Sequence, residues 1–263
     1  SSECDWRTFS ASGVFGAGRI SAWIALCPIT ALPEVLPLLE LAGIRRLVAV
    51  SSTSRFTKKT SRDSRERMLA NNLEQAEAAL KNWAAQKGVS LVVLRTTLTY
   101  DGAGDANIAS MARFIRKFQC LPVLFPANGL RQPLHAQDVA QACLSALRLG
   151  KSHAVYDLSG GETLTYLEMA RRVFDSVGIA PKFIKIPRVL LRILDIVGHA
   201  LPSGLRPPTG IFERMNANLV FDHGPAVRDL NFRPCGFECG PFCGLAGNSF
   251  HPLSEGAQLG FFG

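Results

Sequence analysis

The stretch Leu91-Val-Val-Leu-Arg-Thr-Thr-Leu-Thr-Tyr-Asp-Gly102 decides the fold, because an apolar run passes into a polar loop that ends at glycine. Leu91 to Leu94 is apolar at every position, which is typical of a parallel strand covered on both faces. Further along, Gly129-Leu-Arg-Gln-Pro-Leu-His-Ala-Gln-Asp-Val-Ala140 predicts a short strand that turns into a helix. Together the two segments predict an α/β fold.

The residues before this stretch alternate between the two kinds of element. The pattern predicts a strand at 22–28, a helix at 32–41, a strand at 46–51 and an amphipathic helix at 62–87. Gly88 follows the last helix and predicts its end. Strands that alternate with helices form a parallel sheet with right-handed crossovers, so we expect one here.

After Gly102 the predicted elements become smaller. We expect helices at 108–118, 135–149 and 190–201, and short strands near Val123, Arg131, 155–158 and 182–186. Thr165-Tyr-Leu-Glu168 predicts a helix that begins with a capping box. These elements divide the chain into an α/β domain at 1–150, a smaller mixed lobe at 151–234 to which 105–135 contribute, and a loosely ordered glycine-rich tail at 235–263.

Composition excludes several classes of function. The longest apolar run, 22–32, is far shorter than the ~20 residues of a spanning helix, so we expect no membrane association and a cytoplasmic protein with free thiols. The net charge is +8, but the basic run 45–67 includes acids and the single aromatic residue Phe56, which argues against nucleic acid. The spacing of Cys235, Cys239 and Cys243 is not that of a zinc site, so no metal is predicted.

Four motifs, in order along residues 22 to 234, carry a family resemblance. They are Leu94 to Gly104 (with Thr96 where proline is usual), Arg131 to Ala140, Tyr156 to Glu168 and Phe221 to Pro234. Together they resemble the extended short-chain dehydrogenases/reductases, which include the NAD-dependent epimerases and dehydratases. The resemblance implies a Rossmann-like parallel sheet, with 1–150 a partial NAD(P)-binding domain and 151–234 a substrate lobe. It also implies NAD or NADP as cofactor, a sugar nucleotide or similar small-molecule substrate, and a homodimer through the 62–87 helix.

The resemblance also implies roles for individual residues. Thr53 corresponds to the residue that hydrogen-bonds the reacting oxygen, although a Ser/Thr cluster at a strand end also fits a turn. The implied cofactor-binding residues are Ser51, Ser52, Arg95 and Thr96, and the implied substrate-binding residues are Tyr100, Asn107, Arg131 and His135. The structural alternatives are a helix cap for Asn107, a salt bridge between the lobes for Arg131 and a tie between strand and helix for His135.

The sequence departs from the family at the Tyr-x-x-x-Lys pair. Tyrosine can take a proton from an alcohol, and a nearby ammonium favours its anion. Alignment of the long helix places Leu69 and Leu73 at these two positions, and neither can transfer a proton. Lys58 and Lys59 follow the serine cluster, where a solvated loop pair is the simpler interpretation.

A second departure is the glycine fingerprint. Gly13-Val-Phe-Gly-Ala-Gly18 lacks a preceding strand and a following helix, so we do not expect it to bind phosphate. The resemblance instead predicts that the first strands and the fingerprint precede Ser1, as in an N-terminally truncated chain. Three functions stay open: an epimerase, dehydratase or reductase that depends on NAD(P), a non-catalytic dinucleotide-binding or scaffold protein, and an incomplete, inactive fragment.

Overall fold

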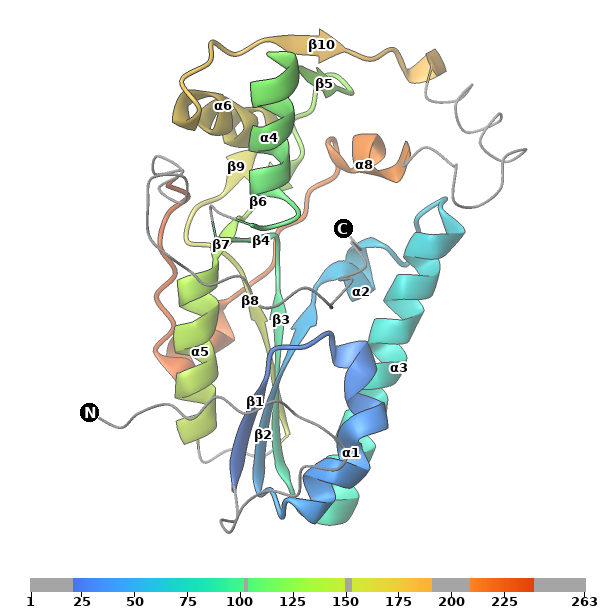
Figure 1. The fold of residues 1–263 in the computed structure, drawn as a ribbon, viewed down its shortest axis with the longest axis vertical. Helices are drawn as coiled ribbons and strands as arrows, with labels where there is room; N and C mark the ends of the chain where they lie inside the picture. Colours follow the sequence, from blue (N-terminus) through green and yellow to red (C-terminus); the bar gives the residue numbers. More distant parts are fainter. Residues whose placement is uncertain (1–20, 102–103, 150–152, 191–208, 239–263) are drawn as a thin grey trace.

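The computed structural model describes residues 21–101, 104–149, 153–190 and 209–238, which form two lobes stacked along the long axis (Figure 1). The larger lobe contains β1 (Ala22–Ala25), η1 (Ile29–Ala31), α1 (Leu32–Leu41), β2 (Arg46–Ser52), α2 (Ser54–Thr57), α3 (Ser64–Lys87), β3 (Ser90–Thr96), α5 (Ala136–Arg148), β8 (Ala154–Leu158) and α9 (Gly224–Leu230). The smaller lobe contains α4 (Ile108–Phe118), β5 (Leu121–Val123), α6 (Tyr166–Ser176), β10 (Phe183–Lys185) and α8 (Thr209–Arg214). Short strands join the lobes: β4 (Thr99–Tyr100), β6 (Leu130–Arg131), β7 (Leu134–His135) and β9 (Leu164–Thr165).

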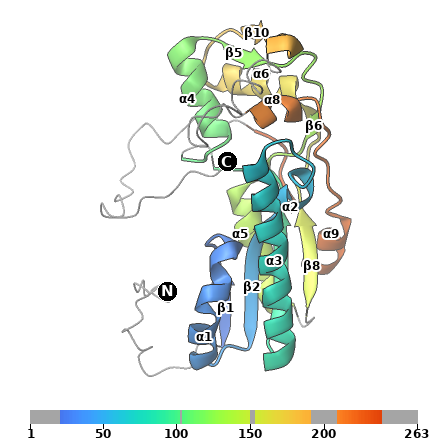
Figure 2. The same ribbon diagram turned by 90° about the vertical axis from the view of Figure 1, so that its right-hand side faces the viewer.

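The sheet of the larger lobe is parallel, which confirms the predicted α/β class. In the described part of the chain its strand order is β1-β2-β3-β8. Helices α1 and α3 pack on one face around Leu80 and Leu91, and α5 and α9 pack on the other around Val92 and Leu158. Figure 2 shows the sheet between these two helical layers. Successive side chains of β3 point to opposite faces of the sheet, and helices cover both faces. This explains why the run from Leu91 to Leu94 is apolar at every position.

The long helix α3 begins two residues after its predicted start at position 62, and it ends at the predicted residue, Lys87. The Asp63 carboxylate accepts a hydrogen bond from the Arg65 backbone N–H at 2.9 Å and caps the first turn. Gly88 has φ +64° and ends the helix in the left-handed conformation. Because the carboxyl ends of the strands and the start of α3 lie toward the smaller lobe, the first turns of α3 face the junction (Figure 1).

The smaller lobe has its own core around Met169 and Phe174. The capping box predicted at Thr165 and Glu168 is present at the start of α6. At α4 the capping group is the carboxylate of Asp105, which accepts from the backbone N–H of residues 107 and 109, whereas the Asn107 side chain makes no capping bond. Phe237, in the segment predicted to be a loose tail, is fully buried in this core.

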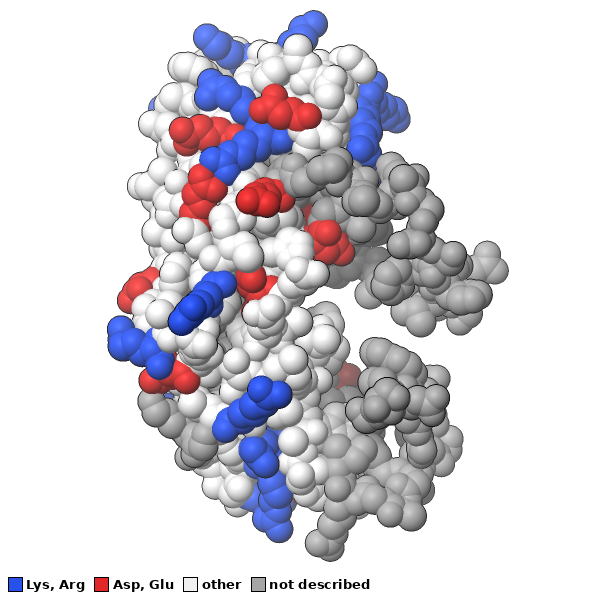
Figure 3. All heavy atoms as spheres, turned by 90° about the vertical axis from the view of Figure 1, so that its left-hand side faces the viewer, with Lys and Arg blue, Asp and Glu red and all other residues white. Residues whose placement is uncertain are grey.

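Some predictions lie outside the described residues: the glycines at 13–18, nearly all of the 190–201 helix and most of the 235–263 tail. Across the described ranges, no helix combines the length and apolarity needed to cross a bilayer. Nor does a group of three metal-binding side chains occur in them. On the face shown in Figure 3, Lys and Arg are scattered among acidic and uncharged residues over both lobes.

Candidate functional site

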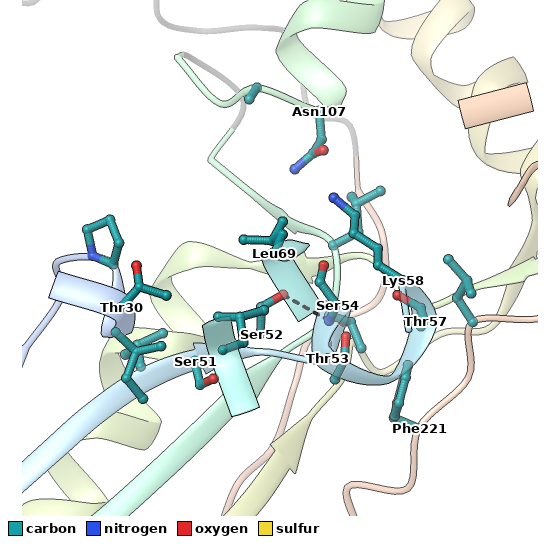
Figure 4. Close-up of a pocket in the computed structure, with 18 of the residues that line it drawn as sticks. Thr30, Ser51, Ser52, Thr53, Ser54, Thr57, Lys58, Leu69, Asn107 and Phe221 are labelled. Atoms are coloured by element: carbon teal, nitrogen blue, oxygen red, sulfur yellow. Dashed lines mark hydrogen bonds between the residues drawn. The ribbon is translucent and has the colours of Figure 1, made fainter. Parts of the chain in front are cut away.

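A cavity of about 590 Å³ lies at the carboxyl ends of β1, β2 and β3, beneath the smaller lobe (Figure 4). Parallel α/β sheets bind ligands at this edge, and the volume suits a small molecule. The polar lining residues are Thr30, Ser51, Ser52, Thr53, Ser54, Thr57, Lys58, Thr97, Asn107, Arg131, Gln132 and Arg214. Leu69 and Leu73 lie among the apolar ones.

The floor of the cavity is the loop that connects β2 to the short helix α2. Thr53 is buried, and its Oγ1 and its backbone N–H both donate to the Thr96 carbonyl, at 3.1 and 3.0 Å. The hydroxyl proton of Thr53 is therefore used within the floor, and only the lone pairs of its oxygen remain to act as acceptors. Ser52 Oγ accepts from the Ser54 backbone N–H at 3.1 Å, which fixes the turn.

A buried charge network holds this floor against α3. Ser51 Oγ donates to Glu77 Oε1 at 2.6 Å, and Arg95 donates to Glu77 Oε2 at 2.7 Å. Arg55, from α2, forms a third contact with the Glu77 carboxylate. Burial alone would raise the pKa of Glu77, but the hydrogen bonds from Arg95 and Ser51 outweigh it and lower this pKa. Arg95 and Thr96 therefore support the floor from beneath and do not line the cavity.

The wall formed by α3 is apolar at the two positions singled out by the sequence. Leu69 and Leu73 both line the cavity, one turn apart on the same helix. The three tyrosines of the chain, Tyr100, Tyr156 and Tyr166, all lie in described ranges and none lines the cavity. The wall therefore offers packing surface where the resemblance implies a proton-transferring pair.

Lys58 corrects one expectation from the sequence. Lys59 is exposed and pairs with Glu74 at 3.1 Å, as a solvated loop lysine does, but Lys58 is only 6% exposed and lines the cavity. In Figure 4 its side chain rises from the end of α2 toward Asn107. Burial, and then the like charge of Arg214, lower the pKa of Lys58, while Glu66 and Asp63 act in the opposite direction.

Arg131 lines the cavity, but its guanidinium is bound by backbone carbonyls. Nη1 donates to Leu130 O at 2.8 Å and Ala217 O at 2.6 Å, and Nη2 donates to Arg214 O. Burial lowers the pKa of Arg131 to about 10. These contacts tie β6 to residues 214–217, so the printed hydrogen bonds of Arg131 go to backbone carbonyls and not into the salt bridge considered for it above.

The three other predicted substrate-binding residues divide between cavity and core. Asn107 lines the cavity, with its Nδ2 at 3.4 Å from Thr99 O. Tyr100 is buried, and its ring packs edge-on against His135 and Phe237. His135 Nδ1 accepts from the Gln137 backbone N–H at 3.2 Å and caps α5. The structure thus brings Asn107 together with the serine cluster, but Tyr100 and His135 lie outside the lining.

The charge of the lining limits its chemistry. Among the described lining residues, Lys58, Arg131 and Arg214 are basic and none is acidic. Arg214 forms an ion pair with Glu66 at the start of α3. Hydroxyls, one amine and an apolar wall can bind a hydroxylated, anionic small molecule. The sequence did not predict that Lys58 is buried and Lys59 exposed, because the two neighbouring lysines have the same polarity.

Comparisons with known proteins agree with this fold. No protein-family model matches the chain. It is 26% identical over 210 residues to subunit 9 of the mitochondrial NADH dehydrogenase (ubiquinone) 1 alpha subcomplex of Arabidopsis thaliana, which covers 74% of this chain and 48% of that protein. The chain spans about half, or less, of the length of the curated relatives it matches.

Solved structures match over most of the chain. RMD from Pseudomonas aeruginosa in complex with NADPH has a TM-score of 0.58 and 17% identity, covering 84% of this chain and 79% of that one. UDP-glucose 4-epimerase from Thermotoga maritima with UDP-glucose has a TM-score of 0.55 and 15% identity, covering 78% and 65%. In its fold, and in these distant sequence matches, the chain is similar to the NAD-dependent epimerases and dehydratases of the extended short-chain dehydrogenase/reductase family.

Proposed function

We propose that the chain binds NAD or NADP, together with a sugar nucleotide or similar hydroxylated small molecule, and lacks the tyrosine-dependent proton transfer of its family. The observation that carries the proposal is the wall of α3, where Leu69 and Leu73 line the cavity and tyrosine is missing from the lining. Two relatives support the ligand class by name, since one structure contains NADPH and another UDP-glucose.

The donor set of the cavity fits the nicotinamide end of such a cofactor. Ile29, Leu69 and Leu73 give an apolar surface for a planar ring, and the hydroxyls of Ser52 and Thr53 lie at the floor. When bound, the nicotinamide supplies hydride chemistry. The residues of this chain would orient the ring and accept a hydrogen bond from a ligand hydroxyl at Thr53. Because leucines cannot take the hydroxyl proton, hydride transfer would lack its usual base.

The test is calorimetric titration of the chain with NADH and NADPH, followed by incubation of the chain and UDP-glucose with NAD and with NADP. We expect binding of a reduced cofactor, no appearance of reduced-nicotinamide absorbance and no epimer of UDP-glucose. Leu69→Trp should fill part of the cavity and weaken binding by roughly tenfold or more, about 1.4 kcal/mol. The control is Leu41→Trp, at an exposed position on the far end of α1, which should bind as the original chain does.

Two outcomes would contradict the proposal. Reduction of NAD or NADP in the presence of UDP-glucose, or formation of an epimer of UDP-glucose, would assign the chain an enzymatic role with a different proton-transferring group. Failure of the folded chain to bind either reduced cofactor would remove the dinucleotide and leave a scaffold role for the same fold.

A further inference from the structure

The outer end of the smaller lobe exposes large apolar side chains. Helix α4 buries Ile108, Ala112 and Ile115 in the core of this lobe. On the flank of the same helix, Phe114 and Phe118 are 37% and 51% exposed. The two phenylalanines lie one turn apart, and their ring centroids are separated by 4.6 Å. A surface helix normally carries polar residues outside its buried stripe, so this flank of α4 is unusually apolar.

The two-stranded sheet of β5 and β10 continues this surface. Two residues separate α4 from β5, and Figures 1 and 2 both show the end of α4 beside β5 and β10. Leu121 and Val123 of β5 are buried, so the residue between them, Pro122, points to the outer side of the sheet. Its register partner Ile184 is half-exposed, and so is Phe125, which follows β5.

The charged residues of these segments are all basic. Residues 106–137, which include α4 and β5, and residues 176–190, which include β10, contain Lys and Arg but neither Asp nor Glu. Of the acids that border them, Asp105 caps the opposite end of α4, Asp138 accepts from a backbone N–H beside α5, and Asp175 belongs to α6. At the upper end of the molecule in Figure 3, the outermost charged side chains are basic.

The amines and the aromatic rings lie against one another. Lys117 Nζ is 5.3 Å from the centroid of the Phe118 ring, and Lys185 Nζ is 4.5 Å from that of Phe125. Apolar and basic groups are therefore mixed over one end of the lobe. This basic–aromatic surface consists of Phe114, Lys117, Phe118, Phe125, Ile184 and Lys185. None of the six lines the cavity described above.

We propose that the basic–aromatic surface binds an anionic lipid bilayer. Its exposed rings and Ile184 enter the boundary between headgroups and acyl chains, while the lysine amines stay among the lipid phosphates and carboxylates. The sequence-based expectation of no membrane association rests on the length of the apolar runs, and binding at a bilayer surface needs no spanning segment. The proposal is independent of the proposed function, because the surface lies outside the cavity.

Nucleic acid is the other polyanion that basic and aromatic residues bind, and the geometry favours it less. Single-stranded nucleic acids stack their bases on open aromatic faces. Here Phe114 and Phe118 lie against each other, and amines lie over the rings of Phe118 and Phe125. Ile184, which is aliphatic, offers no stacking face at all. Lipid chains require only apolar contact, which the ring edges and Ile184 supply.

The experiment is co-sedimentation of the chain with vesicles of phosphatidylcholine, and with vesicles in which about a third of this lipid is replaced by phosphatidylserine. We expect binding to the anionic vesicles only, and weaker binding in high salt, because salt screens the attraction. Lys117→Glu and Lys185→Glu should each weaken binding roughly fivefold or more, the contribution of one basic residue near such a surface. Lys81→Glu, at an exposed position of α3 in the larger lobe, is the matched control.

The apolar contribution is tested separately. Phe118→Ser should weaken binding to the anionic vesicles by roughly tenfold, because the side chain no longer leaves water. Leu144→Ser on α5 is the matched control, since Leu144 is also 51% exposed but belongs to the larger lobe. Both positions lie at the surface, and circular dichroism checks that each variant is folded.

A second measurement reports the depth of the contact. In Phe118→Trp, brominated lipid chains in the anionic vesicles should quench the added fluorescence, whereas Leu144→Trp should show no added quenching. Several results would overturn the proposal: no sedimentation with anionic vesicles, equal sedimentation with neutral ones, the same binding by Lys117→Glu and Lys81→Glu, or no quenching at position 118. Tighter binding of a single-stranded oligonucleotide, weakened by Phe118→Ser, would assign the surface to nucleic acid instead.

Discussion

Glu77 is the residue on which the shape of the cavity floor depends. Its carboxylate accepts from Ser51 and Arg95 and contacts Arg55, so one buried acid joins β2, β3 and α2. The Glu77 carboxylate balances the positive charges of Arg55 and Arg95. Without it, two guanidinium groups would lie close together where little water can solvate them. The floor is therefore held by charge and not by the apolar core alone.

We predict that Glu77→Gln lowers the free energy of unfolding by about 3 kcal/mol, because the buried guanidiniums lose their counter-charge. The control is Glu74→Gln, at a half-exposed acid that pairs with Arg55 and Lys59, which should stay within about 0.5 kcal/mol of the original chain. Denaturant unfolding followed by circular dichroism measures both. Equal stabilities of the two variants would show that the network contributes nothing.

The same network gives a pH dependence with a defined sign. The pKa of Glu77 is lowered from 4.5, so its contribution is complete above that value and is lost as the pH falls through the lower pKa of the folded state. The stability difference between the original chain and Glu77→Gln should therefore shrink on the acid side. A difference that persists unchanged below that range would exclude Glu77 as its source.

At the scale of elements, the helix α3 was predictable and the helix α2 was not. The apolar periodicity of 62–87 and the glycine at 88 reflect local contacts within one helix and the sheet beneath it. Helix α2 has only four residues, too few for an apolar periodicity, and the charge of Arg214 that acts on Lys58 at its end comes from a distant part of the sequence. A local pattern cannot report such a contact, so the two adjacent lysines looked alike.

The residues of the candidate site were also predictable only in part. The resemblance predicted that Leu69 and Leu73 replace the usual pair, and both line the cavity. Tyr100 and His135 match their motifs equally well in sequence, yet each is held in a contact outside the lining, with Phe237 or with the first turn of α5. Their assignment to the substrate stays a prediction, as does the assignment of Arg95 to the cofactor, because a motif fixes a residue's position along the chain and not the partners of its side chain.

The end of α3 offers a prediction on a single element. Gly88 has φ +64° and open space around its Cα, so an added methyl group meets strain in the backbone and no neighbouring atom. Gly88→Ala should lower the free energy of unfolding by about 1 kcal/mol, with Gly88→Asn intermediate because asparagine tolerates this conformation. Gly104→Ala, which has open space and no positive φ, is the matched control. Thermal unfolding of the three variants decides the order.

At the scale of the whole molecule, the two lobes meet over the cavity through a few polar contacts. Arg214 of α8 pairs with Glu66 at the start of α3, and the more exposed Glu213 lies 3.5 Å from Arg62. Figure 1 shows α8 above the start of α3. Because Arg214 also lines the cavity, this pair couples the position of the smaller lobe to the shape of the site.

We predict that Glu66→Gln loosens this junction without unfolding the sheet. The side chains of Arg214 and Glu66 are 21% and 14% exposed, so the pair is less screened than a surface ion pair, and its loss should speed amide hydrogen exchange in α8 by roughly tenfold. Exchange in β2 and β3 should stay unchanged, because these strands lie in a separate core. Glu213→Gln, which removes a pair whose side chains are 44% and 72% exposed, is the matched control and should leave α8 unaffected. If α8 exchanges equally in both variants, the lobes are held by Arg131 and its three carbonyls, and the charge pair only follows their position.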